Sequence, residues 1–298
     1  MINPACERFL APLGMTTTKT VLEVLQSTTA YFEKHRIESP RLNAEHLIAH
    51  VLKLSRLELY LEFETRPNER ELSQLRELVK RRGQSEPLQH LLGTVEFCGQ
   101  VFAIDKRALV PRPETEALVE LIISDFRFQI SDFRLIDVGT GSGIIALSLA
   151  KEFPAAKIFA VDISEEALAL ARENAVRLGL SDRVRFEKAD LLESLPERFD
   201  LIVANLPYVS MRDRHLLAPE VLHDPEIALF AGPIGDELVR RLIEVAPGHL
   251  SPGGLLALEI GINHAEGLTE FLRQKNYHDI RSKKDYAGIS RFLLARYG

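Results

Sequence analysis

Residues 134–143 read RLIDVGTGSG, and this stretch is the strongest indication of the fold class. An apolar run of strand type passes directly into a glycine-rich turn, and the apolar helix pattern IIALSLAKEF follows. Glycine lets a backbone turn tightly and approach a bound cofactor, with the N-terminus of the next helix behind it. Ile144 stands where a dinucleotide fingerprint needs its third glycine, so the match to an NAD site is imperfect. The candidate cofactor loop consists of Gly139, Thr140, Gly141, Ser142 and Gly143.

Strand and helix patterns alternate along the chain around this loop. The strand patterns are RLIDVG (134–139), KIFAVDIS (157–164), RVRFEKAD (183–190), FDLIVANLPY (199–208), GLLALEIG (254–261) and RFLLARY (291–297). Helix patterns occupy 143–152, 165–178, 235–246 and 264–274. Apolar strands separated by helices predict a doubly wound, mostly parallel α/β sheet that is covered on both faces. In such sheets, ligands bind beyond the carboxyl ends of the strands.

Two acidic residues follow the next two strands after the glycine loop. Asp162 lies 19 residues after Gly143, where a carboxylate reaches ribose hydroxyls in both NAD and S-adenosylmethionine enzymes. The alternative role for Asp162 is to cap the helix that begins at Ser164. Asp190 ends the third strand, where its carboxylate would accept a hydrogen bond from an adenine amino group; the alternative is an ordinary turn residue.

The fourth strand ends in a distinctive loop, Asn205-Leu206-Pro207-Tyr208. An amide side chain, an X-Pro step and an aromatic ring in sequence can grip a planar NH2 group, because carbonyl oxygens accept its hydrogens while the ring covers its face. Pro207 holds Leu206 out of the helical region, which helps to aim the Leu206 carbonyl. The alternative is an ordinary loop after a strand. Together with the glycine loop, these four residues predict catalysis on an amino or amide nitrogen.

The N-terminal third has a different character. Residues 1–15 match no pattern and are expected to be a disordered extension, whereas residues 16–92 show only helical spacing. Ser39 before Pro40 predicts an N-cap, and Pro67 is expected to open a further helix. The resulting bundle would serve either as a stabilising cap or as a substrate-recognition module. Residues 93–108 predict a linking β-hairpin around Gly99, and the repeated ISDFR at 123–127 and 130–134 is interpreted as an insertion without function.

The composition excludes several classes of protein. With 298 residues, 46% of them hydrophobic and 27% charged, the chain has room for about two folded domains. Cys6 and Cys98 form neither a CxxC pair nor a disulfide framework, which is typical of a reducing compartment. No apolar run approaches the roughly 20 residues of a membrane helix, and the N-terminus lacks a signal-peptide pattern. We therefore expect a cytoplasmic location without a membrane partner.

Charge is distributed unevenly along the chain. Residues 1–90 carry 13 Lys and Arg against 12 Glu and no Asp, a net charge of +1, while the remainder carries 24 basic and 31 acidic residues, a net charge of -7. The acidic, larger part offers no broad basic field for a phosphate backbone. Direct binding of DNA is therefore not expected.

The glycine loop, Asp162 and NLPY together resemble the class I S-adenosylmethionine methyltransferases that modify planar amino groups, whose motif is (D/N)PPY. LVPRPETE at 109–116, joined to a helical N-terminal domain, is similar to a narrower group. That group, the PrmC/HemK family, N5-methylates the glutamine of the GGQ motif in class 1 peptide chain release factors. The resemblance covers about residues 18–298 and includes LHDPEIAL (222–229), PGGLLALEIG (252–261) and DYAGISR (285–291).

The resemblance implies a seven-stranded, Rossmann-like methyltransferase domain over 109–298, a monomeric enzyme, and a release factor as the protein partner. Gly139 to Gly143 would wrap the methionine part of S-adenosylmethionine, Asp162 would hold the ribose, and Asp190 with Leu191 would border the adenine. Asn205 would face both the cofactor and the glutamine amide. The implied substrate-binding residues are Asn205, Leu206, Pro207, Tyr208, Phe97, Phe102, Arg112 and Glu114.

Two residues depart from the family pattern. Leu206 replaces the first proline of the motif, which preserves the carbonyl but removes some rigidity, and Cys98 stands where the family has an aromatic residue. The alternatives are a DNA adenine or cytosine amino methyltransferase, whose flipped base offers the same NH2 hydrogens, a nicotinamide oxidoreductase, and a non-enzymatic binding module in which Leu206 has disabled the site. The acidic charge and PRPETE weigh against the first alternative. The missing third glycine and NLPY weigh against the second.

Overall fold

The computed structural model describes residues 19–126, 133–193 and 195–298 and divides into two compact units, which meet in sequence at Gly93 and Thr94. The expected extension, residues 1–15, and part of the ISDFR repeat lie outside the described residues. No helix in the described ranges is long and apolar enough to cross a membrane.

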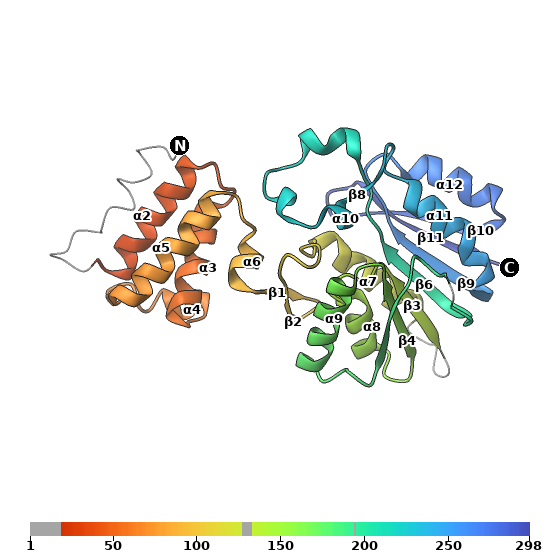
Figure 1. Ribbon diagram of the computed structural model, residues 1–298, viewed down its shortest axis with the longest axis horizontal. Coiled ribbons are helices and arrows are strands. Elements are labelled where there is room, and N and C mark those ends of the chain that lie inside the picture. Colours follow the sequence, from red (N-terminus) through yellow and green to blue (C-terminus); the bar gives the residue numbers. More distant parts are fainter. Residues whose placement is uncertain (1–18, 127–132, 194) are drawn as a thin grey trace. The chain divides into compact units, whose positions relative to one another are not determined.

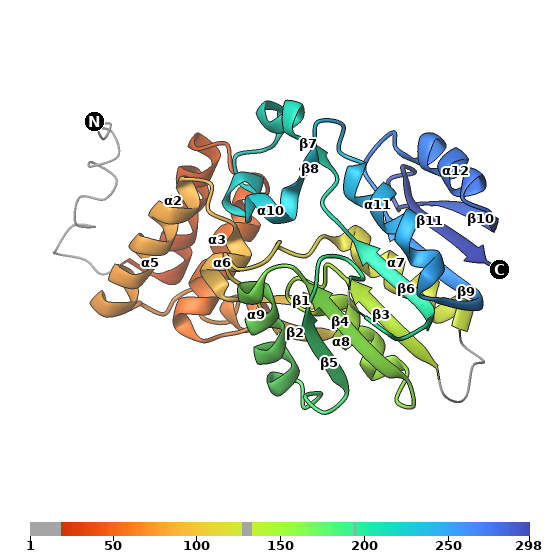
Figure 2. The ribbon, with the colours of Figure 1, turned by 45° about the vertical axis from the view of Figure 1, so that its right-hand side comes forward.

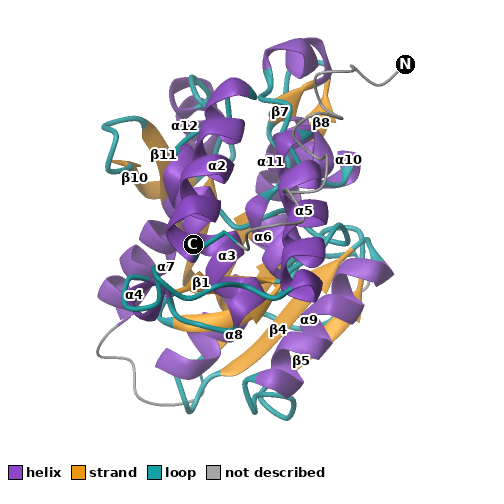
Figure 3. Ribbon diagram, turned by 90° about the vertical axis from the view of Figure 1, so that its left-hand side faces the viewer, coloured by secondary structure: helices purple, strands orange, loops and turns teal. Residues whose placement is uncertain are grey.

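The first unit is helical. Its helices are α2 (Val21–Lys34), α3 (Pro40–Leu52), α4 (Arg56–Leu59), α5 (Glu69–Gly83) and α6 (Leu88–Leu92). The described residues up to Gly93 contain no strand (Figure 3). The long helices bury one apolar side each, and Phe32, Leu47 and Leu59 are completely inaccessible to solvent. This amphipathic packing explains why helical spacing was visible in the sequence.

Helix starts in this unit differ in detail from the sequence prediction. Ser39 occupies the N-cap position of α3 before Pro40, but its backbone is left-handed (φ 47°) and its side chain makes no capping bond. Helix α5 begins at Glu69 and not at Pro67, because Asn68 and Glu71 form a reciprocal capping box. The capping box therefore sets the start of α5, and Pro67 lies two residues before it.

The second unit opens with the predicted hairpin, β1 (Thr94–Phe97) and β2 (Gln100–Ala103). The remaining elements in chain order are α7 (Pro113–Phe126), β3 (Arg134–Val138), α8 (Ile144–Glu152), β4 (Lys157–Asp162), α9 (Glu165–Arg177), β5 (Val184–Lys188), β6 (Phe199–Asn205), β7 (Val209–Ser210), α10 (Glu226–Leu229), β8 (Phe230–Gly232), α11 (Glu237–Val245), β9 (Leu250–Glu259), α12 (Ala265–Gln274), β10 (Tyr277–Lys284) and β11 (Ser290–Tyr297). Short 3-10 turns lie at Met211–Leu216, Val221–His223 and Ala246–Gly248.

The main sheet has seven strands in the order β10-β11-β9-β6-β3-β4-β5 (Figures 1 and 2). Strands β9, β6, β3, β4 and β5 run parallel, and β11 pairs antiparallel with both of its neighbours. The predicted doubly wound, mostly parallel α/β fold is therefore confirmed. Strand β10 had no counterpart among the sequence patterns, because it is a polar edge strand with little buried surface.

Alternate residues of the central strands face two separate apolar layers. Leu135 belongs to the layer that contains residues of α7 and α8, while Ile136 belongs to the layer that contains residues of α11 and α12. Figures 1 and 2 show these helices beside the sheet. This pattern follows from the two-residue period of a strand. Both faces are covered, which is why the central strands read as continuous apolar runs.

The order of the strands also locates a crevice. From β3 the chain continues to β4 and β5 on one side of β3, and then returns to β6 on its other side. Such a reversal is the point at which parallel α/β sheets bind ligands, beyond the carboxyl ends of the strands. The glycine loop after β3 and Asn205 at the end of β6 therefore meet at this point.

Candidate active site

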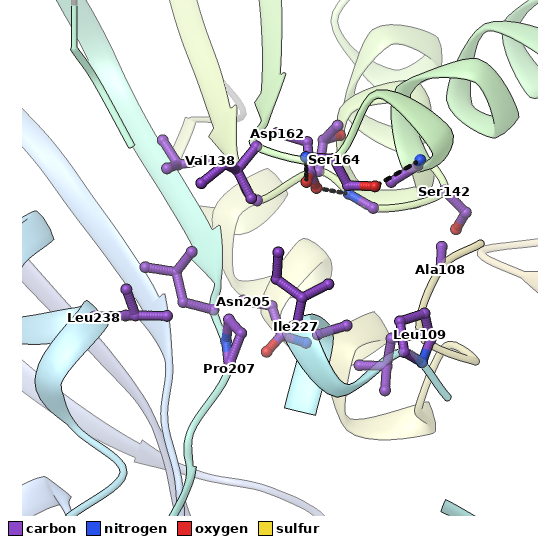
Figure 4. Close-up of a pocket in the computed structure, with 18 of the residues that line it drawn as sticks. Ala108, Leu109, Val138, Ser142, Asp162, Ser164, Asn205, Pro207, Ile227 and Leu238 are labelled. Carbon is purple, nitrogen blue, oxygen red and sulfur yellow. Dashed lines mark hydrogen bonds between the residues drawn. The ribbon is translucent and has the colours of Figure 1, made fainter. Parts of the chain in front are cut away.

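A cavity of about 240 Å³ lies at the carboxyl ends of β3, β4 and β6. In Figure 4, Asp162 and Ser164 lie across this cavity from Asn205 and Pro207, and Leu109 and Ile227 contribute apolar side chains. Segments that are far apart in sequence therefore converge here. The sequence-predicted residues among its lining are Arg112, Gly139, Thr140, Gly141, Ser142, Asp162, Asp190, Leu191, Asn205, Leu206 and Pro207.

The glycine loop is held in a shape that favours glycine. Gly139 and Gly141 have φ angles of 73° and 56°, in the left-handed region. The N–H groups of Gly139 and Thr140 both donate to the Val161 carbonyl oxygen at 2.9 Å. A Cβ atom on Gly139 would lie 2.8 Å from Leu206 Cδ2, so the loop after β3 passes directly against the NLPY segment.

Asp162 fastens this loop to the next strand. Its Oδ2 accepts the Gly141 N–H at 2.9 Å and its Oδ1 accepts the Ser164 N–H at 2.8 Å (Figure 4). Ser164 itself caps α9 through the Ala167 N–H, so the alternative of Asp162 as the helix cap is not needed. Burial raises the pKa of Asp162, against the effect of its backbone hydrogen bonds. A carboxylate has about four lone-pair positions, so Asp162 can still accept a ligand hydroxyl beside its backbone hydrogen bonds.

Asp137, which lies in the first candidate stretch but was given no role of its own, holds the glycine loop by hydrogen bonds. It is completely buried, and its Oδ2 accepts the Thr140 hydroxyl at 2.6 Å and the Ala146 N–H at 3.1 Å. Burial raises the pKa of Asp137 to about 7. An acidic residue inside an otherwise apolar strand, two positions before the first glycine, was the available signal.

Asp190 and Leu191, which follow β5, form another part of the cavity lining. Asp190 Oδ2 accepts a hydrogen bond from Arg241 Nη2 at 3.0 Å, and both side chains are partly exposed. Leu191 is 8% exposed and has a left-handed backbone with φ 55°. Together with Ile163 and Leu238 it gives this part of the cavity an apolar surface. Arg241 was not predicted, because an arginine on an amphipathic helix normally indicates only a solvated face.

The NLPY segment is anchored by partners from two distant elements. Asn205 is the last residue of β6, and its Nδ2 donates to Thr115 Oγ1 at 3.1 Å. Thr115 Oγ1 in turn donates to Glu259 Oε2 at 2.8 Å. Burial raises the pKa of Glu259 to about 7, although the hydrogen bond from Thr115 and the charge of Arg291 act in the opposite direction. Neither Thr115 nor Glu259 was selected individually from the sequence.

Arg112 of the PRPETE motif also has a structural partner. Its Nη2 donates to Asp224 Oδ2 at 2.8 Å, and Asp224 Oδ1 accepts the Val110 N–H at 3.1 Å. Burial raises the pKa of Asp224 to about 6, against the charge of Arg112. The pair connects the segment before α7 to the LHDPEIAL segment, which contributes Pro225 and Ile227 to the cavity.

Five of the predicted residues are not among the residues that line the cavity. Phe97 and Phe102 occupy inward positions of the hairpin, where their rings meet edge to face at 6.2 Å inside the apolar layer. The reason is strand alternation, which turns both rings toward the core. Gly143 is required for helix packing, since a Cβ there would lie 3.0 Å from Ala171 and 3.1 Å from Leu147.

Tyr208 and Glu114 are the other two predicted residues that do not line the cavity. The Arg291 guanidinium lies over the Tyr208 ring at 5.9 Å from its centroid. Burial raises the pKa of Tyr208 to about 12, and the negative charge of Glu259 acts in the same direction. Glu114 lies in the first turn of α7, and its charge acts on both Tyr208 and Glu259.

Comparison with known proteins adds independent information. Residues 23–93 match the PrmC N-terminal domain and residues 130–232 match a methyltransferase domain. The release factor glutamine methyltransferase of Rhodopirellula baltica is 40% identical over 292 residues, covering 95% of this chain and 98% of that protein. The protein of the same name from Geobacter sulfurreducens is 39% identical over 281 residues, covering 94% of this chain and 97% of that protein.

Solved structures show the same fold. The T. thermophilus 16S rRNA N2 G1207 methyltransferase in complex with AdoMet and guanosine superposes with a TM-score of 0.52 at 19% identity, covering 69% of this chain and 50% of that chain. The family predicted from NLPY and PRPETE is confirmed by the sequence relatives over nearly the full length of the chain. This chain belongs to the release factor glutamine methyltransferase family.

Proposed function

We propose that this chain transfers a methyl group from S-adenosylmethionine to the side-chain nitrogen (N5) of the glutamine in the GGQ motif of class 1 peptide chain release factors. The observation that carries this proposal is the common cavity. Asn205, which can grip an amide, lines the same 240 Å³ space as the glycine loop and Asp162. An amide site and a cofactor site are thus within reach of each other.

The residues of the cavity fit S-adenosylmethionine. Gly139 and Gly141 carry no Cβ atom and line the cavity, so the backbone at these two positions is open to the methionine part. Asp162 presents a carboxylate from the end of β4 for the ribose hydroxyls. Leu191 and its apolar neighbours offer a surface for the adenine ring, with the Asp190 carboxylate at its border.

The contribution of the protein to methyl transfer is chiefly positional. When bound, S-adenosylmethionine supplies a methyl group on a positively charged sulfur, which is already activated for transfer. A glutamine nitrogen is a poor nucleophile, because its lone pair is delocalised into the carbonyl. Asn205 Oδ1 and the Leu206 carbonyl each accept one N–H of that amide and align the nitrogen with the methyl group. Placement of this kind contributes up to about 7 to 11 kcal/mol.

The same two acceptors stabilise the charge that develops during transfer. As the nitrogen–carbon bond forms and the carbon–sulfur bond breaks, positive charge appears on the amide nitrogen, and oxygen acceptors favour it. Residues 205–208 include neither His nor Lys. The amide proton is therefore released to water after transfer.

The helical unit is proposed to recognise the protein substrate. A glutamine on a protein loop offers contacts beyond a small cavity, and Leu57 and Leu61 of this unit are 78% and 83% exposed. Leu61→Glu is expected to raise KM for an intact release factor about tenfold while leaving a short GGQ peptide unaffected. Gln26→Glu, at an exposed position of α2, controls for the added charge. Equal losses for both substrates would make the unit a stabiliser.

The remaining proposals concern the oligomeric state, the cellular location and DNA binding. We propose that it acts as a monomer in the cytoplasm and does not bind DNA. The net charge of -7 over residues 91–298 supports the last point. Light scattering of the purified chain tests the oligomeric state, and a mobility-shift assay with duplex DNA tests DNA binding.

The decisive test is mass spectrometry of a purified class 1 release factor after incubation with the full chain and S-adenosylmethionine. The GGQ peptide should gain the mass of one CH2 group. A release factor carrying glutamate in place of that glutamine should remain unchanged, because it lacks the amide nitrogen. An unmodified GGQ peptide together with methyl transfer to DNA would instead favour a DNA amino methyltransferase.

A further inference from the structure

Behind Asn205 lies a short chain of hydrogen bonds that the mechanism above does not use. It runs from Glu259 at the end of β9 through Thr115 in the first turn of α7 to the Asn205 amide. Glu259 and Thr115 are each 1% exposed. Thr115 is among the residues that line the cavity, whereas Glu259 is not. Three separate elements are thus joined at one buried point behind the NLPY segment.

The donors and acceptors of these groups fix the direction of each hydrogen bond in the series. A carboxylate has only acceptors, a hydroxyl has one proton and two lone pairs, and an amide has two donors on nitrogen and two lone pairs on oxygen. Ionised Glu259 takes the single Thr115 proton, so Thr115 Oγ1 can then only accept from its other neighbour. That neighbour must therefore be the Asn205 nitrogen, which leaves the Asn205 oxygen for other partners.

We propose that Glu259, acting through Thr115 and through its own hydrogen bond with Asn205, is a positioning residue that holds the Asn205 amide with its nitrogen toward the protein and its oxygen toward the cavity. This inference rests on the proposed function, in which Asn205 Oδ1 accepts an N–H of the substrate glutamine. An amide turned by 180° would present N–H to N–H and repel that substrate. The buried carboxylate thereby selects the catalytic one of two nearly isosteric orientations.

Arg291 favours the ionised form of Glu259, against the effects of burial and of the Glu114 charge. Arg291 on β11 acts on the Glu259 carboxylate as a positive charge, and its side chain is only 14% exposed. Asp285, at the start of the DYAGISR motif, holds Arg291 by an ion pair of 3.3 Å. The closing motif of the chain is thus connected to the NLPY segment through Arg291 and Glu259.

The first test removes the hydroxyl. Thr115→Val is nearly isosteric but cannot relay the hydrogen bond, whereas Thr115→Ser retains the hydroxyl and is the matched control. Thr115→Val is expected to lower kcat about tenfold to a hundredfold, with the Kd for S-adenosylmethionine within about threefold of wild type. Thr115→Ser should restore most of the rate. A kcat for Thr115→Val within about twofold of wild type would overturn the proposal.

The second test reverses the donor and acceptor roles in this series of hydrogen bonds. Asn205→Asp offers only acceptors toward Thr115, whose single proton Glu259 already takes, so kcat should fall about a hundredfold or more. Adding Glu259→Gln supplies an N–H donor to Thr115 Oγ1, which frees the Thr115 proton for one oxygen of the new carboxylate and leaves its other oxygen facing the cavity. The double variant should therefore recover at least about tenfold in kcat over Asn205→Asp alone. Additive losses in the two variants would refute the directional role.

The controls distinguish a failure of this inference from a failure of the proposed function. Melting temperature and S-adenosylmethionine titration are measured for every variant, so a purely structural role would appear as parallel losses of stability, cofactor affinity and rate. Such parallel losses, without recovery in the double variant, would overturn the proposal. An active wild-type chain with an unaffected Thr115→Val variant refutes only the positioning role. A wild-type chain that leaves the release factor unmethylated refutes the proposed function and this inference together.

Discussion

Replacement of Asp162 by alanine tests whether the carboxylate holds a ribose or only the glycine loop. In the structure, Asp162 accepts N–H groups of Gly141 and Ser164 at 2.9 and 2.8 Å and also lines the cavity. Asp162→Ala removes both backbone bonds and the acceptors that a bound ribose would use. The two roles therefore predict different dependence on the ligand.

The magnitude follows from the type of hydrogen bond. A bond to a charged group contributes about 1.5 to 3 kcal/mol, and every 1.4 kcal/mol corresponds to tenfold in affinity. Loss of the ribose contact should therefore raise the Kd for S-adenosylmethionine roughly tenfold to 150-fold. Loss of the bond to Gly141 loosens the loop in addition, which should lower the melting temperature of the unliganded chain.

Titration calorimetry with adenosine and 2′,3′-dideoxyadenosine separates these contributions. If Asp162 binds the ribose, the variant should bind adenosine more weakly than wild type does, while the two proteins should bind the dideoxy compound about equally. The same loss of affinity for both compounds would show that Asp162 only shapes the loop. Unchanged binding of adenosine would remove Asp162 from the site altogether.

Three further predictions concern the cavity and the buried aspartate that supports its glycine loop. Asn205→Ala should lower kcat at least about tenfold with nearly unchanged affinity for S-adenosylmethionine, since only a transition-state contact is lost; matched losses in a kinetic and calorimetric comparison would make Asn205 a cofactor residue. Leu206, which is 5% exposed, should tolerate replacement by proline. The preset φ of proline contributes about 0.4 to 1 kcal/mol to stability, and the lost methylene costs about 0.8 kcal/mol, so the two effects nearly cancel. A melting curve and a methylation assay that show an unstable, inactive protein would mean that the leucine side chain or its N–H is needed. Burial raises the pKa of Asp137 from 3.8 to about 7, so the folded chain keeps a proton that the unfolded chain releases, and the free energy of unfolding should fall as pH rises between about 4 and 7. Asp137→Asn should abolish this contribution in urea unfolding, and a difference between wild type and variant that stays constant with pH would contradict it.

Much of the fold and half of the site were contained in local sequence patterns. Apolar strands that alternate with amphipathic helices announce a parallel sheet, because each element buries a face set by its own periodicity. The glycine loop and Asn205 each follow directly from an apolar strand, so their meeting at one sheet edge could be expected without coordinates. Strand β10 escaped this reasoning because an exposed edge strand carries no apolar period.

The remaining part of the site depends on tertiary contacts between distant residues. Thr115 lies 90 residues before Asn205 and 144 before Glu259, and Arg112 lies 112 before its partner Asp224. Phe97 resembled a residue of the substrate pocket, yet strand alternation turns its ring into the core, where it packs against Phe102. By itself, the sequence predicted the order of the elements, the glycine loop after β3 and the NLPY segment after β6, because these depend on neighbouring residues and the spacing between them. Only the folded chain decided which buried acid orients Asn205 and which aromatic rings are excluded from the cavity, because those outcomes depend on the side chains that meet when strands and helices pack.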